Sequence, residues 1–300
     1  MRLGISLNDH LASPPAEVTA ALRQAADEGF TSAWLADTRG LDAMAALAVA
    51  GAQAPDIEVG TAVVPVHLRH PVAMAQGALT TDLATGGRFT LGIGLSHRPV
   101  IEEMYHLSFD KPARYMEEYV SILLPLLREG SASFSGEALG ADAAMSLRPA
   151  GELPVLLAAL APRMLRLAGA VADGTILWMT GPRTVESHIV PLIAEAAAEA
   201  GRPSPRVVST LAVCVTDDEG AARARAGEAF ARYATLPSYR AMLDKEGADG
   251  PGDVILAGDE TSVRQQVEAQ AAAGVTDFVA VEFAEGEEAG RTRALLRSLL

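Results

Sequence analysis

One junction recurs along this chain and limits the folds that it can adopt: a helix-like stretch ends at a glycine, and an apolar run follows. It occurs at Gly29, Gly174 and Gly274, in AADEGFTSAWLAD, AGAVADGTILWM and AAAGVTDFVAVEF. Glycine is the usual left-handed C-cap of a helix, and short apolar runs indicate buried strands. Helices that alternate with buried strands are typical of parallel sheets with crossover helices. The repetition therefore predicts an α/β protein.

The same reading applied to the whole chain gives eight strand–helix units. The predicted strands are Arg2–Leu7, Ser32–Ala36, Glu58–Val63, Arg88–Ile93, Pro154–Leu157, Thr175–Trp178, Val207–Val215 and Phe278–Glu282. The predicted helices are Pro15–Glu28, Asp42–Gln53, Val72–Leu83, Lys111–Leu127, Pro162–Val171, Arg183–Ala200, Asp217–Ala234, Thr261–Ala273 and Glu287–Leu300. Eight units in 300 residues match a (β/α)₈ TIM barrel, which needs about 250 residues plus insertions. A doubly wound open sheet is the alternative.

We expect a single domain over residues 1–300, because no linker rich in Pro, Gly or Ser divides the chain. Two stretches interrupt the alternation of strands and helices. Residues Gly130–Pro149 are interpreted as a β-hairpin insertion, and Thr235–Asp259 as a polar, glycine-rich excursion. Long loops at the active-site face of a barrel can act as lids, and tolerated surface insertions fit these stretches equally well.

Charge and cysteine content exclude several classes of partner. The net charge is −14, whereas nucleic acids and anionic membranes are bound by basic surfaces. No run approaches the ~18 consecutive apolar residues that a membrane span needs, and the first residues lack the features of a secretory signal. Cys214 is the only cysteine, so no intrachain disulfide can form. We expect a cytoplasmic protein that binds neither nucleic acid nor membrane.

Charged residues, histidines and small residues gather where the predicted strands end, whereas the strand interiors are almost entirely apolar. These segments are NDH (8–10), ADT (36–38), AVVPVHLRHP (62–71), GIGLSHRP (92–99), AALAPR (158–163), WMTGP (178–182), CVTDD (214–218) and VEF (281–283). In a (β/α)₈ barrel the loops after the strands build the active site. We therefore expect function at this face.

Three familiar motifs are incomplete in these segments. Gly92 and Gly94 supply the start of a dinucleotide-binding loop, but His97 stands in place of the third glycine. GLSHR lacks the second glycine of a nucleophile elbow, because Arg98 stands there. His67 and His70 are three residues apart without a third ligand nearby, so we expect no metal.

The stretch PVLLAALAPRMLRLAGAV holds a helix start without a side-chain cap. Pro162 suits the first helical position, where its missing N–H costs nothing. Ala161 then occupies the N-cap and offers no oxygen to the free backbone N–H groups. Such a start leaves donors either for a phosphate or for water.

Together these segments resemble the bacterial luciferase-like superfamily of flavin and deazaflavin (coenzyme F420) oxidoreductases, over essentially the whole chain. The resemblance is densest in VGTAVVPVHLRHPVAMAQGALTTDLATGGRFTLGIGLS and PVLLAALAPRMLRLAGAVADGTILW. GGRFTLGIGLSH and APRMLRLAGAVADG are most similar to the deazaflavin-dependent branch. The resemblance implies a (β/α)₈ barrel with the ring of the cofactor at the C-terminal mouth.

The resemblance also assigns roles to residues. Asp37 matches the acid that touches the polar side of the ring, and Ala62–Val63 match a non-prolyl cis peptide behind the ring. The other matched cofactor-binding residues are Leu95 and Ser96 beside the cofactor, Ala158, Ala159, Leu160, Ala161, Pro162 and Arg163 at its phosphate, and Trp178 to Thr180 as a wall. Relatives that oxidise sugar phosphates carry histidine where this chain has Thr38 and a carboxylate where it has His97. The resemblance therefore does not extend to that activity.

The leading interpretation is an enzyme that transfers a hydride between coenzyme F420 and a small, apolar substrate. An FMN-dependent monooxygenase and a non-catalytic flavin-binding or deazaflavin-binding protein are the alternatives. A proton must accompany the hydride, and the titratable candidates are His10, Asp37, His67, His97, Tyr105 and Glu282. We select His97 for the proton, because imidazole titrates near neutrality, and Asp37 for the ring. The apolar segments LDAMAALAVAGAQAP and HPVAMAQGALTTDLA predict a homodimer contact.

Overall fold

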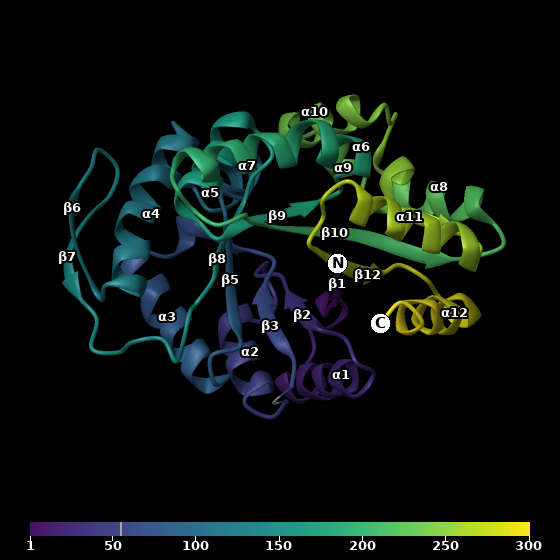
Figure 1. The fold of residues 1–300 in the computed structure, drawn as a ribbon, viewed down its shortest axis with the longest axis horizontal. Coiled ribbons are helices and arrows are strands. Elements are labelled where there is room, and N and C mark those ends of the chain that lie inside the picture. Colours follow the sequence, from purple (N-terminus) through teal and green to yellow (C-terminus); the bar gives the residue numbers. More distant parts are fainter. Residues whose placement is uncertain (55) are drawn as a thin grey trace.

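The computed structural model describes residues 1–54 and 56–300 and contains a closed parallel barrel (Figure 1). Its eight strands are β1 (Arg2–Ser6), β2 (Ser32–Leu35), β3 (Glu58–Thr61), β5 (Phe89–Gly94), β8 (Val155–Ala158), β9 (Gly174–Trp178), β10 (Arg206–Val215) and β12 (Asp277–Glu282). Each strand pairs in parallel with the next, β12 pairs with β1, and β9 pairs with β10 through Arg206–Thr210. The (β/α)₈ barrel is confirmed, and the open sheet is excluded.

Helices surround the barrel on its outer side (Figure 1). They are α1 (Pro15–Asp27), α2 (Ala43–Gly51), α3 (Pro71–Ala84), α4 (Pro112–Arg128), α5 (Pro162–Val171), α7 (Val190–Glu199), α8 (Glu219–Ala229), α11 (Glu260–Ala272) and α12 (Gly286–Arg297), with the shorter α6 (Pro182–Thr184), α9 (Ala231–Ala234) and α10 (Pro237–Glu246). The main core fills the space between strands and helices, and a smaller core of Trp34, Leu156, Ile176, Val208 and Val279 fills the barrel itself. None of the described helices is long and apolar enough to cross a membrane.

The junction glycines have two different physical reasons. Gly29 and Gly274 follow α1 and α11 with φ angles of 95° and 99°, a region where side chains are strained, as a glycine C-cap requires. Gly174 lies inside β9, and a Cβ there would come within 2.1 Å of the Arg206 carbonyl oxygen. The junction at Gly174 therefore reflects the close approach of β9 and β10, and Ala172 caps α5 instead.

The two interruptions take different forms. Residues Ser131–Ser135 and Gly140–Ala144 form the antiparallel hairpin β6–β7, as predicted, and it projects beside α4 (Figure 1). The polar excursion at Thr235–Asp259 forms regular structure. It contains α10 and a short strand, β11 (Leu256–Gly258), which pairs in parallel with β10. The predicted helix Asp217–Ala234 ends early, at Ala229, and α9 follows after Phe230. A further short strand, β4 (Val64–Pro65), pairs with β5.

An ion-pair network closes the N-terminal end of the barrel. The Arg206 guanidinium lies 2.7 Å from an Asp277 carboxylate oxygen and 3.0 Å from a Glu58 carboxylate oxygen. Arg2 pairs with the same two acids from the rim. Because charged side chains occupy this end, the open end is the one where the strands terminate, which is the functional face of TIM barrels.

Candidate active site at the barrel mouth

The floor of the mouth is built where β3 ends. The Ala62–Val63 peptide bond is cis, as the sequence led us to expect. The Ala62 amide donates a 2.9 Å hydrogen bond to the Leu35 carbonyl, which ties this bend to β2. The side chains of Ala62, Val63 and Ala158 pack on the core inside the barrel. These three residues, named the mouth floor here, form a small apolar platform.

Glycines in β5 let the residues of the mouth floor pack directly against this strand. A Cβ on Gly94 would lie 2.7 Å from Val63 Cγ2 and 3.1 Å from Ala158 Cβ, and one on Gly92 would lie 2.0 Å from the Thr61 carbonyl oxygen. The GIG motif is therefore required by neighbouring strands, which approach it too closely for a side chain. The atoms that a side chain on these glycines would meet belong to Val63, Thr61 and Ala158.

A carboxylate and a guanidinium form the polar side of the mouth floor. The Asp37 amide donates to the Val63 carbonyl at 3.4 Å, which places Asp37 beside the cis peptide. The Asp37 side chain is 13% exposed, and Arg69 donates to it at 3.2 Å while also pairing with Asp42. Burial raises the pKa of Asp37, and the charge of Arg69 opposes this rise. Arg69 was not singled out from the sequence, because it lies 32 residues from Asp37.

The helix start at the end of β8 has the predicted form. Helix α5 begins at Pro162, the N-cap residue Ala161 is extended (φ −77°, ψ 148°), and no side chain accepts from the first turn within the described residues. The Leu165 amide donates the first helical hydrogen bond, to the Ala161 carbonyl at 3.0 Å. The amides of Arg163 and Met164 come before this bond and have no acceptor within the helix. These amides are donors at the rim of the mouth.

The other residues of this turn point in different directions. Ala159 is buried in the main core, and the Leu160 carbonyl oxygen lies 2.9 Å from Nε2 of His188. The Arg163 guanidinium forms two hydrogen bonds with the Glu117 carboxylate of α4, at 2.9 and 2.8 Å, and is 61% exposed. The side chain of Arg163 is therefore engaged with α4, and only its backbone amide faces the helix start.

The loop after β5 carries His97 over the mouth. Leu95 packs against the main core, and Ser96 has a positive φ of 60°. The His97 ring packs edge-on against Tyr233 and Tyr239, with ring centroids 6.2 and 5.7 Å apart. Burial lowers the pKa of His97, and the charge of Arg232 lowers it further.

The end of β9 supplies the opposite side. Trp178 is half-buried and packs edge-on against Phe230, with centroids 5.4 Å apart. Met179 has a φ of 53° and is buried, which marks a sharp bend after the strand. Thr180 is buried too, and its hydroxyl donates to the Trp178 carbonyl at 3.2 Å. The Thr180 hydroxyl thus stabilises the bend after β9.

A family model for luciferase-like monooxygenases matches residues 1–294. The chain belongs to this family. It is 29% identical to a putative coenzyme F420-dependent oxidoreductase of Mycobacterium tuberculosis, over 93% of this chain and 94% of the relative. The resemblance inferred from the strand-end motifs is confirmed by this match.

Two solved structures share the fold of this luciferase-like chain. The coenzyme F420 dependent tetrahydromethanopterin reductase from Methanopyrus kandleri superposes with a TM-score of 0.83 at 23% identity, covering 99% of this chain and 97% of the other. The FMN-bound oxygenating constituent of 3,6-diketocamphane monooxygenase from Pseudomonas putida gives a TM-score of 0.75 at 17% identity, covering 99% and 96%. At these identities the likeness concerns the fold alone, and the two proteins that share this fold differ in the cofactor that their names give.

Sequence reasoning missed the aromatic side of this luciferase-like mouth. Phe230 lies between α8 and α9, Tyr233 in α9 and Tyr239 in α10, and their rings pack on Trp178 and His97. We name these five residues the aromatic wall. The signal available in the sequence was the aromatic content of FARYATLPSY (230–239), which spans the end of the predicted helix Asp217–Ala234 and the start of the polar, glycine-rich stretch.

The alternative proton source, Glu282, lies outside the mouth. Its carboxylate pairs with Arg293 of α12 at 2.7 Å, and Arg293 also pairs with Glu28. Side chains alternate along a strand, and Val279 points into the barrel whereas Phe278 and Ala280 pack on the helices. Glu282 has the same parity as the residues that face the helices, so we withdraw it as a proton source.

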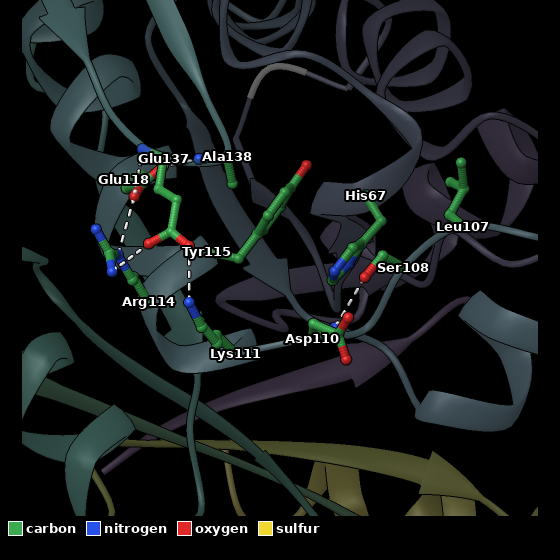
Figure 2. A pocket seen from close by; sticks show the side chains of 10 residues that line it. All are labelled: His67, Leu107, Ser108, Asp110, Lys111, Arg114, Tyr115, Glu118, Glu137 and Ala138. Carbon is green, nitrogen blue, oxygen red and sulfur yellow. Dashed lines mark hydrogen bonds and ion pairs between the residues drawn. The ribbon is translucent and has the colours of Figure 1, made fainter.

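His67 lines a separate cavity of about 440 Å³, between the loop after β5, α4 and the hairpin turn (Figure 2). Its ring stacks on Tyr115, with centroids 4.5 Å apart, and on Phe109 at 5.4 Å. The cavity also contains Glu118, whose pKa is lowered to about 2 by the backbone amides of the hairpin turn, that of Ala138 first.

The charges around this cavity are balanced by contacts within the protein. In Figure 2 Glu137 lies between Lys111 and Arg114 and pairs with both. His70 sits nearby as the N-cap of α3. Among residues 1–54 and 56–300 no three His, Cys, Asp or Glu side chains are grouped as a metal site would require. His10 and Tyr105, the remaining candidates, are half-buried in the loops after β1 and β5.

Proposed function

We propose that this chain is a coenzyme F420-dependent oxidoreductase that transfers a hydride between the deazaflavin and a small, uncharged organic substrate. One observation carries the proposal: the mouth floor, the Asp37–Arg69 pair and the uncapped start of α5 all follow the carboxyl ends of barrel strands, at the same end of the barrel. The match over nearly the full length of a putative F420-dependent oxidoreductase supports the choice of cofactor.

The arrangement fits the chemistry of a deazaflavin. A planar, largely apolar ring suits the mouth floor, where Ala62, Val63 and Ala158 present only small aliphatic groups. The polar edge of the ring would face Asp37 and Arg69, which offer an acceptor and a donor. The phosphate would accept from the free amides at the start of α5, where the helix dipole also favours an anion.

When bound, the coenzyme donates or accepts a hydride, that is, two electrons and one hydrogen nucleus. In the oxidising direction, His97 accepts the proton from the substrate hydroxyl as the hydride leaves the adjacent carbon and a carbonyl forms. In the reducing direction, the same proton returns from the imidazolium of His97 to the oxygen. Because burial and Arg232 lower the pKa of His97, its imidazole is neutral near pH 7 and ready to accept a proton.

The physiological form is proposed to be a homodimer in the cytoplasm. Helices α2 and α3 contain one charged residue between them, Asp82, and it is buried. On their outer faces Val49 and Leu83 are 50% and 43% exposed among alanines. Uncharged, smooth helix faces are typical of subunit contacts. Sedimentation should therefore give a dimer that Val49→Glu disrupts, and a wild-type monomer at all concentrations would refute this.

Turnover tests the proposed reaction. Under anaerobic conditions, the enzyme should oxidise reduced coenzyme F420 when one member of a panel of ketones, aldehydes and enones is added. Turnover that requires reduced FMN and oxygen would instead identify a monooxygenase. Binding of the coenzyme without turnover across the panel would favour a non-catalytic carrier.

A further inference from the structure

The guanidinium of Arg69 is shared between two carboxylates. Its Nη2 atom lies 3.2 Å from a carboxylate oxygen of Asp37, beside the mouth floor, and 2.5 Å from one of Asp42. Asp42 is the N-cap of α2, and its other carboxylate oxygen accepts from the Ala45 amide at 3.0 Å. The head of the Arg69 side chain is therefore tied both to the acid of the proposed site and to the first turn of a helix.

The backbone of Arg69 is held from another side, by a buried phenol of α4. The Tyr119 hydroxyl donates to the Arg69 carbonyl at 2.8 Å, and the Tyr119 side chain is buried. Burial raises the pKa of this phenol, so it stays protonated and remains a donor. Arg69 itself is extended (φ −140°, ψ 125°) between the short 3₁₀ turn Val66–Leu68 and the start of α3. The phenol thus fixes the place from which the Arg69 side chain leaves the backbone.

The charge of Asp37 depends on this arrangement. Burial raises the pKa of the Asp37 carboxyl, and the charge of Asp42 raises it too, whereas the charge of Arg69 and the Ala43 amide lower it. A nearby opposite charge favours the ionised form of an acid, and it does so less as the distance grows. A displacement of Arg69 should therefore be measurable as a change in the pKa of Asp37.

We propose that Tyr119 and Asp42 are positioning residues for the coenzyme, because they fix the two ends of Arg69, which in turn holds Asp37 toward the polar edge of the ring. This inference rests on the proposed function and adds two residues that act through Arg69. Tyr119 belongs to the helices outside the barrel, and Asp42 caps one of them. Neither residue was selected from the sequence as part of the site.

Conservative variants separate positioning from a purely structural role. Tyr119→Phe removes only the hydroxyl and keeps the ring in the core. Asp42→Asn removes the charge and keeps a side-chain oxygen that caps α2. Tyr115→Phe is the matched control, because this tyrosine of the same helix stacks on His67 in the other cavity (Figure 2). Carbon-13 NMR of the aspartate carboxyls measures the pKa of Asp37 in coenzyme-free protein, with its signal identified by Asp37→Asn.

The two variants should shift the pKa of Asp37 in opposite directions. Tyr119→Phe releases the Arg69 backbone, so this pKa should rise and coenzyme F420 should bind about three- to tenfold more weakly at pH 7. Asp42→Asn removes a negative charge and leaves Arg69 to Asp37 alone, so the pKa should fall below the wild-type value. Fluorescence titration across pH should show the loss of coenzyme affinity on the acid side moving up in Tyr119→Phe and down in Asp42→Asn. Tyr115→Phe should match the wild type in both measurements.

Repeating both substitutions in an Arg69→Met background tests whether they act through Arg69. Tyr119→Phe should then leave the pKa of Asp37 unchanged, and Asp42→Asn should lower it less than in the wild type. Equal shifts with and without Arg69, or no shift in either folded single variant, overturn the proposal. If Tyr119→Phe does not fold, the comparison of Asp42→Asn with and without Arg69 decides alone. Failure of the wild type to bind coenzyme F420 refutes the proposed function instead, whereas the pKa of Asp37 is measured without coenzyme, so the two failures are distinguishable.

Discussion

A single methyl group at Gly94 tests whether the mouth floor carries the coenzyme. The Cβ of Gly94→Ala would lie 2.7 Å from Val63 Cγ2, whereas carbon atoms pack at about 3.5–4.0 Å. Val63 must therefore move by about 1 Å. The new methyl group cannot shift away from Val63 instead, because Ala158 Cβ lies only 3.1 Å from it on another side. Overpacking of this kind costs about 1–3 kcal/mol. A displaced Val63 would rise into the space of the ring, so we expect coenzyme affinity to fall about tenfold or more.

Two other glycines separate this local effect from general damage. Gly92→Ala would place Cβ 2.0 Å from a backbone oxygen, which cannot give way as a side chain can, so we expect the free energy of unfolding to fall severely. Gly290 lies in α12 with no atom near its Cβ position, and Gly290→Ala should stabilise the fold by about 0.5–1 kcal/mol without affecting binding. Denaturant unfolding and fluorescence titration with coenzyme F420 measure both quantities. A folded Gly94→Ala protein with wild-type affinity would refute the proposed position of the ring.

Further variants probe the phosphate, the proton and the acid. Ala161→Asp places a carboxylate at the start of α5, and coenzyme affinity should fall ten- to a hundredfold, about 1–3 kcal/mol, whereas unchanged affinity in a folded variant would remove the turn from the site. His97→Ala should lower kcat by about 10²–10⁴ and leave the affinity for the coenzyme within a few-fold of the wild type. Because the pKa of His97 is lowered, the pH profile of wild-type kcat should fall on its acid side below about pH 6.5, and the variant should lack this fall. Asp37→Asn should raise the free energy of unfolding at pH 7 while weakening coenzyme binding. The raised pKa of Asp37 means that the folded state binds its proton more tightly, so wild-type stability falls as the pH rises above about 4, and the advantage of the variant should shrink below that pH. Arg69 keeps Asp42 as a partner in this variant, and equal stability at pH 7 would count against the burial argument.

The parts of the site that lie next to one another in the sequence were predictable. The helix start at Pro162 follows from proline and alanine at adjacent positions, whose backbone preferences are local. The barrel follows from the alternation of strands and helices, which is a property of the whole chain. The cis peptide at Ala62–Val63 was predicted only through the family resemblance, since nothing in the local composition requires it.

The parts that depend on distant contacts were not predictable. Glu282 was placed at the mouth because it ends a strand, but the parity of the strand turns its side chain toward Arg293. The aromatic wall joins the loop after β5, the end of β9 and the segment from Phe230 to α10, whose order in the chain says nothing about ring contacts. Arg69 reaches Asp37 across such a distance as well. Packing between loops decided each of these outcomes.

Equilibrium binding of the two cofactors measures the central claim most directly. Purified protein titrated with coenzyme F420 and with FMN, by calorimetry or fluorescence quenching, yields two dissociation constants under identical conditions. We expect coenzyme F420 to bind at least tenfold more tightly, and Ala161→Asp to weaken it. Tighter binding of FMN would contradict the assignment and place this chain among the flavin-dependent members of its family.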